Sequence, residues 1–494
     1  MAQAVVEEQQ LLKALRWYDG FVIALANPGF LLGSLGFSVL DLGGWGAMML
    51  WGITAAIAVF LNIIYSELAA MFPEKPGGIA LYAHEGWRRY TTVVGPVATF
   101  GYWLAWSVVL AIFGILIGQF VQAQWFPGSP LGTPYDNGWF STGSVNIGLP
   151  HLIGTGLIVV VWVFNVLGIR VSVRFGYLAG ILLCLPLFAF IILPYLTGDF
   201  SSSNLTYKLN DPGLAWGGWQ LAIVWVWIMT WSAWGVDVCA TFAPEYKDTV
   251  NDTKKALRSA AVFSLLVYTF LPLGMVGAGG EKDVGAYAYG AVLHKLVGGA
   301  DDLFVIFLIA SLLICMNTAT ADGSRALYGI ARDGMTIKQL YHLNRFHVPA
   351  RAMTLDMVVN ILFVWFVGNI FGILAASNLG YVLAHFFALT AFILLRRDRP
   401  EWPRPIHLGR AWVPIASACS VICLVLTVVG FGWFQIAAGG YGGTKEKVIG
   451  IAVLVLGLAL FLFRRIAQDH EAPQWREETP RVPGEVVQTT AASH

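Results

Sequence analysis

Apolar residues run along this chain in long blocks that are separated by short polar connections. The blocks are about 20 residues long, which is the length that an α-helix needs to cross the hydrocarbon core of a bilayer. There are twelve of them, at approximately residues 20–38, 44–66, 92–121, 149–169, 174–197, 217–243, 259–280, 303–331, 353–371, 374–395, 411–434 and 448–463. The pattern predicts an all-α polytopic membrane protein with 12 transmembrane helices.

Composition and charge agree with this pattern. Of the 494 residues, 57% are hydrophobic and only 12% are charged, whereas soluble proteins carry roughly 25% charged residues. Of the 30 Lys and Arg residues, 24 lie in alternate connections and in the terminal segments. Because Lys and Arg favour the cytoplasmic side, we expect a multi-pass protein of the cell membrane with both termini in the cytoplasm. The net charge of +1 and the lack of a basic patch give no indication of nucleic acid binding.

Two of the expected spans are interrupted. The first contains Asn27-Pro28-Gly29, where Pro28 removes a backbone donor and Gly29 permits unusual dihedral angles. The sixth contains Ser232-Ala233-Trp234-Gly235, and Asp237 follows directly. Because the interruptions lie five spans apart, they predict two inverted repeats of five helices with a binding site between them. A simple proline kink is the alternative explanation for the first span.

Several motifs resemble those of the amino acid–polyamine–organocation (APC) superfamily of permeases. They include WYDG at residues 17–20, YSELAAMFP at 65–73, LGIR at 167–170, FAPE at 242–245 and ARDG at 331–334, in the order that the family has them. The resemblance implies a LeuT-like fold, which is a 5+5 inverted repeat plus two C-terminal helices. It also implies transport by alternating access.

These expectations divide the chain into five parts. They are a cytoplasmic N-terminus at 1–14, a first five-helix repeat at 15–198, a second, inverted repeat at 215–398, two additional transmembrane helices at 408–466 and a cytoplasmic tail at 467–494. The tail is charged and contains proline, so we expect it to be disordered.

The candidate substrate-binding residues lie mainly at the two interruptions. Asn27 and the amide of Gly29 can bind an anionic group at the positive end of the half-helix that follows, and a packed kink is the alternative. In the resemblance, Trp231 aligns with an aromatic gate, and the face of a tryptophan attracts an ammonium group. Packing is the alternative in a chain with 20 tryptophans. The complete expected lining is Asn27, Pro28, Gly29, Trp103, Ser107, Trp231, Ser232, Gly235 and Asn317.

The candidates for coupling transport to an ion are Asp237, Thr318, Thr320 and Asp322. A buried carboxyl group can carry a proton or pair with a substrate amine, and a structural ion pair is the alternative. Hydroxyl and carboxylate oxygens also suit sodium. Asp322 and Arg325 lie three residues apart and can instead pair with each other, while threonine in membrane helices often bonds its own backbone.

Protons are favoured over sodium because the carboxylates are evident from the sequence, whereas a sodium geometry is not. In the resemblance, Leu183 occupies the place of a lysine found in sodium-independent relatives, so that fixed cation is missing here. His385 in the tenth span is either a packing histidine or a proton relay.

The predicted function is secondary active transport of amino acids or small organic amines, either proton-coupled or by exchange. Arrangements typical of enzymes are missing and the five cysteines lack metal-ligand spacing, so we expect no catalytic residues, no metal and no cofactor. The expected partners are the small-molecule substrate, a proton or sodium, and the lipid bilayer. The alternatives are a sodium-coupled transporter of the same fold and a non-transporting sensor.

Overall fold

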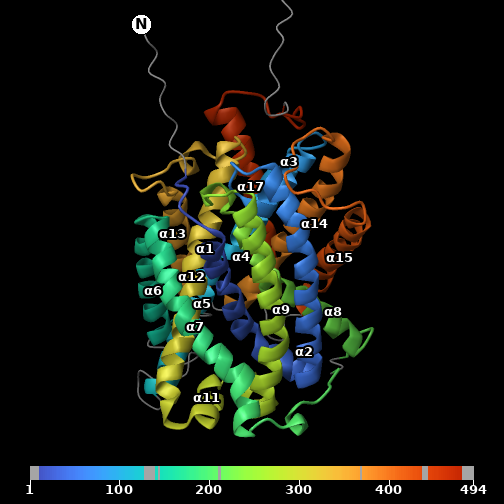
Figure 1. The fold of residues 1–494 in the computed structure, drawn as a ribbon. Helices are drawn as coiled ribbons and strands as arrows, with labels where there is room; N and C mark the ends of the chain where they lie inside the picture. Colours follow the sequence, from blue (N-terminus) through green and yellow to red (C-terminus); the bar gives the residue numbers. More distant parts are fainter. Residues whose placement is uncertain are drawn as a thin grey trace, which may run out of the picture.

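The computed structural model describes residues 11–126, 140–142, 145–209, 213–286, 288–367, 370–436 and 443–480. Within these ranges the chain is a bundle of long helices that run between two ends of the molecule (Figure 1). A two-stranded antiparallel hairpin, β1 (Phe140–Thr142) with β2 (Val145–Ile147), is the one sheet among the described residues. The helical class predicted from the sequence is therefore confirmed.

Long and short helices make up most of the described chain. They are α1 (Trp17–Ala24), α2 (Ala26–Met71), α3 (Gly78–Trp87), α4 (Val94–Ser107), α5 (Val109–Trp125), α6 (Leu149–Val166), α7 (Ile169–Thr197), α8 (Gly218–Ala233), α9 (Asn251–Gly279), α10 (Glu281–Gly285), α11 (Tyr289–Val297), α12 (Asp301–Arg332), α13 (Ala350–Phe366), α14 (Ile370–Asp398), α15 (Trp412–Trp433) and α17 (Thr444–Phe463). Two short 3-10 helices, η4 (Gly235–Ala240) and η5 (Ala243–Glu245), follow α8.

In the described part of the chain, ten helical segments are long and apolar enough to cross a membrane. The first, Trp17–Met71, has 55 residues and contains a bend at Gly43, whose φ of 73° and ψ of 170° are not helical. Large apolar side chains are exposed on the outside of the bundle, among them Ile181, Phe188 and Val428. Such a surface is unfavourable in water and suits contact with lipid.

The structure interrupts a helix near both predicted positions, but Asn27, Pro28 and Gly29 are themselves helical residues of α2, so the predicted break at these three residues is wrong. α8 ends at Ala233 and is replaced by 3-10 turns up to Glu245, close to the predicted position. The first interruption is a single turn at Leu25, two residues earlier than predicted. Pro28 lies in the first turn of α2, where a backbone N–H has no helical acceptor and proline is tolerated.

We call the end of the bundle that carries residues 11–16 and 469–480 the terminal end. Ion pairs join several segments there: Lys13–Glu74, Lys75–Glu85, Lys75–Asp333, Glu85–Arg399, Glu67–Arg396 and Arg88–Glu477. Burial raises the pKa of Glu85, but Lys75 and other cations outweigh burial and hold it at about 2. Lys75, Glu85, Arg88, Arg399 and Glu477 form one connected network that reaches the last described segment. No ion pair among the described residues joins Lys13–Glu74 or Glu67–Arg396 to it.

The segment that follows α17 is part of this network. Gln474 and Trp475 accept hydrogen bonds from the hydroxyl and amide of Thr92 at 2.7 and 3.0 Å. Glu477 pairs with Arg88 and Arg465. Residues 1–10 of the expected N-terminal segment and 481–494 of the expected tail lie outside the described residues.

Close packing against glycine residues determines how near the helices of the central region lie to one another. A Cβ atom on Gly29 would clash with Sγ of Cys315, and one on Gly101 would lie 2.6 Å from the carbonyl oxygen of Gly380. Small residues allow such close approach of helices where hydrophobic attraction between them is weak. Gly29 thus brings α2 against α12, and Gly101 brings α4 against α14.

Candidate functional site

Asn27 joins the two interruptions. Its Nδ2 donates to the carbonyl oxygen of Ser232 at 2.6 Å, and its Oδ1 accepts from the hydroxyl of Ser264 at 2.6 Å. Tyr268 donates to the backbone carbonyl of Asn27 at 2.8 Å and shares a second hydrogen bond with Ser232. A Cβ on Gly235 would lie 3.1 Å from Asn27 Nδ2. The predicted residues Asn27, Ser232 and Gly235 are therefore in contact, with the amide of Asn27 engaged by protein groups.

An aromatic group covers this junction. Trp231 donates from Nε1 to the carbonyl of Ala105 at 3.1 Å, and its ring centroid lies 5.3 Å from that of Phe30. Phe30 also contacts Trp106 and stacks on Phe113. Phe30 and Trp106 were not among the predicted residues, because an aromatic residue in an apolar span carries no signal that distinguishes it from packing.

Asp237 lies in η4, directly after the second interruption. Its Oδ1 accepts a hydrogen bond from Tyr381 at 3.1 Å, while Oδ2 has no hydrogen-bond partner among the described residues. Nε2 of His385, which also lacks a partner in the described part of the chain, is 3.9 Å from that oxygen. Both side chains are completely buried. The separation of 3.9 Å is longer than a hydrogen bond, so the two atoms are not bonded to each other, and either of them could hold a proton or a small cationic group.

His385 belongs to a longer polar row across the bundle. Its Nδ1 hydrogen-bonds to the hydroxyl of Tyr65 at 2.7 Å, and its ring packs edge-on against Tyr381 and Trp234. The row therefore links α2, η4 and α14. This contact fits both the packing and the relay interpretations of His385.

Asp322 lies beside a second buried carboxyl group, Asp356 of α13, which the sequence analysis did not identify. Neither oxygen of Asp322 and only one oxygen of Asp356 has a hydrogen-bond partner among the described residues. That partner is Nε1 of Trp103, which donates to Oδ1 of Asp356 at 2.7 Å. Ser107 accepts from Asn360 at 2.9 Å. Trp103 and Ser107 thus face α13 rather than the Asn27 junction.

Threonine and cysteine side chains of α12 face the end of α1. Thr318 donates to the carbonyl of Ile23 at 3.1 Å, and Cys315 donates to the carbonyl of Ala26 at 3.1 Å. Thr320 bonds the carbonyl of Met316 in its own helix, in agreement with the alternative considered for it. The carbonyl oxygens at the first interruption therefore already have donors.

Two other predictions differ from the contacts in the structure. Asn317 hydrogen-bonds with Asn165 and Ser172 at the junction of α6 and α7, so its side chain is separate from the group around Asn27. Arg325 pairs with Glu245 rather than with Asp322, and both members of that pair are completely buried. Arg325 reaches past its own helix because η5 brings a carboxylate directly opposite it.

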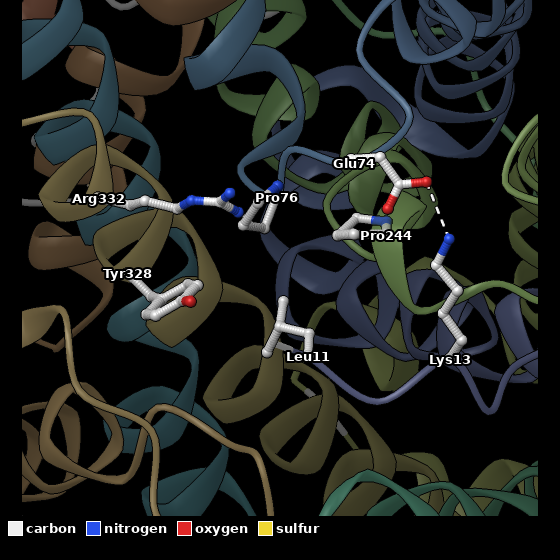
Figure 2. A pocket seen from close by; sticks show the side chains of 7 residues that line it. All are labelled: Leu11, Lys13, Glu74, Pro76, Pro244, Tyr328 and Arg332. Atoms are coloured by element: carbon white, nitrogen blue, oxygen red, sulfur yellow. Dashed lines mark hydrogen bonds and ion pairs between the residues drawn. The ribbon is translucent and has the colours of Figure 1, made fainter. Parts of the chain in front are cut away.

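A pocket opens at the terminal end (Figure 2). One of its lining residues, Pro244, directly precedes Glu245 of the buried Glu245–Arg325 pair. The volume of the pocket is about 310 Å³. Its lining residues come from the segment before α1, the connection between α2 and α3, η5 and the end of α12: they are Leu11, Lys13, Glu74, Pro76, Pro244, Tyr328 and Arg332. None of them was predicted as a site residue, since each lies in or beside a polar connection.

Comparison with known proteins adds an independent finding. The family described as "Amino acid permease" matches residues 17–460. A putative arginine/ornithine antiporter of Escherichia coli is 23% identical over 87% of this chain and 86% of its own length. A gamma-aminobutyric acid permease of Bacillus subtilis is 24% identical over 67% of both chains, and an uncharacterized amino acid permease of the same organism is 22% identical over 72% of this chain and 78% of its own.

Proposed function

Because the chain belongs to the amino acid permease family, we propose that it is a secondary active transporter of amino acids or small organic amines that works by alternating access. The observation that carries the proposal is the buried, half-satisfied carboxylate of Asp237 beside an interrupted helix. Membrane helices are interrupted where substrate or ion binds. An ionisable residue in a membrane span marks a functional site by default.

The helix pattern supports twelve spans in a 5+5 repeat. Ten segments meet the length and hydropathy criteria among the described residues. The first of these segments has 55 residues, which is long enough for two spans that meet at Gly43. The helix α13, with 17 residues, is a further span. Counted in this way, the chain has twelve spans. Residues 15–198 and 215–398 then form the repeats, with 408–466 as the two additional helices. The clustering of Lys and Arg at the terminal end supports a cytoplasmic location for both termini in the cell membrane.

Protons are the coupling ion that we propose. Asp237 and His385 present two unsatisfied polar atoms to each other at 3.9 Å, and a proton needs no additional space. Sodium requires several oxygen ligands. The carbonyls of Ile23 and Ala26, which face α12, accept hydrogen bonds from Thr318 and Cys315 instead. Those donors argue against a cation at that junction.

The substrate site that we propose lies around Trp231, Phe30 and the Asn27 junction, with Asp237 at its edge. The names of the relatives mention arginine, ornithine and gamma-aminobutyric acid, so these three compounds are the first substrates to test. All three carry an amine or guanidinium group that a tryptophan face can attract.

The test is uptake of these compounds into liposomes that contain the purified protein, under an imposed pH gradient or an imposed sodium gradient. We expect the pH gradient to drive uptake and the sodium gradient to have no effect at constant pH. Uptake driven by sodium alone would overturn proton coupling. Binding without counterflow of any compound would overturn transport and favour the non-transporting sensor.

A further inference from the structure

The pocket at the terminal end has a cation on one wall and an ion pair on the other. In Figure 2, Arg332 extends into it from one side, and Glu74 lies on the other side with Lys13. Lys13 and Glu74 form an ion pair at 2.8 Å, and their side chains are 47% and 60% exposed. Arg332 is exposed and has no ion pair with any described residue. One cation on these walls is therefore uncompensated.

The pocket adjoins a part of the molecule that is closed by the buried ion pair Glu245–Arg325. Pro244, on its wall, precedes Glu245, which is buried and paired with Arg325. Arg325, Tyr328 and Arg332 recur every three to four residues, so they share one face of α12. That face leads from the pocket to the ion pair.

The segment before α1 strengthens this closure. The amides of Ala14 and Leu15 both donate to the carbonyl oxygen of Glu245 at 2.9 Å, and Lys247 donates to the carbonyl of Leu15 at 2.7 Å. Leu11 and Lys13 of the same segment line the pocket. The pocket and the closure are therefore built from the same segments of the chain.

We propose that this pocket is a second binding site, which takes a zwitterionic amino acid at the terminal end of the transport path. Arg332 binds the carboxylate, and Glu74 binds the ammonium group in place of Lys13. A guanidinium matches the planar geometry of a carboxylate. The volume of about 310 Å³ accommodates a small amino acid. The inference rests on the proposed function only in assigning this end to the cytoplasm and amino acids as the substrate.

The test measures occupancy of the pocket without transport. Leu11 is replaced by cysteine in a full-length Cys184→Ser background, and the rate of its modification by a polar maleimide is followed in purified protein. We expect L-alanine to slow the modification, and propionate or ethylamine, each with a single charge, to need about tenfold higher concentrations, since each loses one charge-assisted hydrogen bond. Equal protection by propionate or ethylamine would overturn the zwitterion assignment.

Two charge-removing variants and two controls complete the test. Arg332→Gln and Glu74→Gln should each raise the half-protecting concentration of L-alanine about tenfold. Lys338→Gln removes an exposed cation of the same end that pairs with Asp469 and should leave protection unchanged. Trp231→Leu, in the central site, should also leave it unchanged. No protection by L-alanine, protection that survives Arg332→Gln, or protection lost in Trp231→Leu would each overturn the proposal, whether or not the protein transports amino acids.

Discussion

The two interruptions are in contact, but they differ in whether their polar groups have hydrogen-bond partners. At the first, Asn27 is engaged by Ser232, Ser264 and Tyr268, and nearby carbonyls accept from α12. At the second, Asp237 keeps one oxygen without a partner among the described residues. An unsatisfied polar atom costs free energy in a low-dielectric interior. The difference favours our proposal that proton coupling depends on the second interruption, whereas the side chain of Asn27 at the first is already bound by protein groups.

The largest expected effect comes from removing the charge at the second interruption. Asp237→Asn should abolish uptake driven by a pH gradient, because the side chain no longer takes up and releases a proton. Exchange of labelled for unlabelled substrate should persist, since it needs no net proton movement. Asp41→Asn, which changes a carboxylate bonded to Trp225, is the matched control and should retain driven uptake. Equal loss of exchange and driven uptake in Asp237→Asn would make it a binding or folding residue and remove the contrast.

The next largest effect is expected at Asn27, which connects the first interruption to the second. Asn27→Ala should lower the apparent melting temperature, because it leaves Ser264 and the carbonyl of Ser232 without their partner at a cost of about 1–3 kcal/mol. Asn62→Ala is the control, since the one hydrogen bond of the Asn62 side chain to the described residues is to the carbonyl of Ala58 in its own helix. If both variants melt at the same temperature, Asn27 does not hold the interruptions together.

A smaller effect is expected at the aromatic group that covers the junction. Trp231→Leu should raise the KM for a cationic substrate about tenfold, from loss of a cation–π contact. Trp225→Leu and Trp227→Leu lie on the same helix and should have less effect on KM. Equal changes in all three variants would show that Trp231 is a packing residue.

The second interruption and Asp237 could be predicted because glycine and a charge within an apolar run are local signals, whereas the first interruption lies two residues before the predicted Asn27-Pro28-Gly29. Tyr381 and Ser264 could not be predicted, because they bond to residues 144 and 237 positions away and no local pattern encodes such distances. Asn317 and Thr318 show a further limit. Neighbours on a helix point about 100° apart, so Thr318 faces α1 while Asn317 faces α6 and α7.

The smallest effect is expected near Gly43 and Gly44, at the end of the bundle opposite the termini. Glu281 of α10 accepts hydrogen bonds from the amides of Gly44 and Thr206 and pairs with Lys208. Burial raises the pKa of Glu281, but these partners outweigh burial and lower it from 4.5 to about 2. A carboxyl group with a lowered pKa in the folded state stabilises that state at pH values above its unfolded pKa.

Glu281→Gln should therefore lower the apparent melting temperature at pH 7 by about 1–3 °C, and this difference should shrink as the pH falls from about 4.5 towards 2, where the wild-type carboxyl becomes protonated. Asp283→Asn, which changes an exposed carboxylate of the same helix, should give no such pH-dependent difference. Gly44 follows the bend at Gly43. A loss of driven uptake in Glu281→Gln at pH 7 would therefore show that a part of the first span distant from the first interruption contributes to transport. Unchanged uptake together with the lowered melting temperature would keep the chemistry at the second interruption.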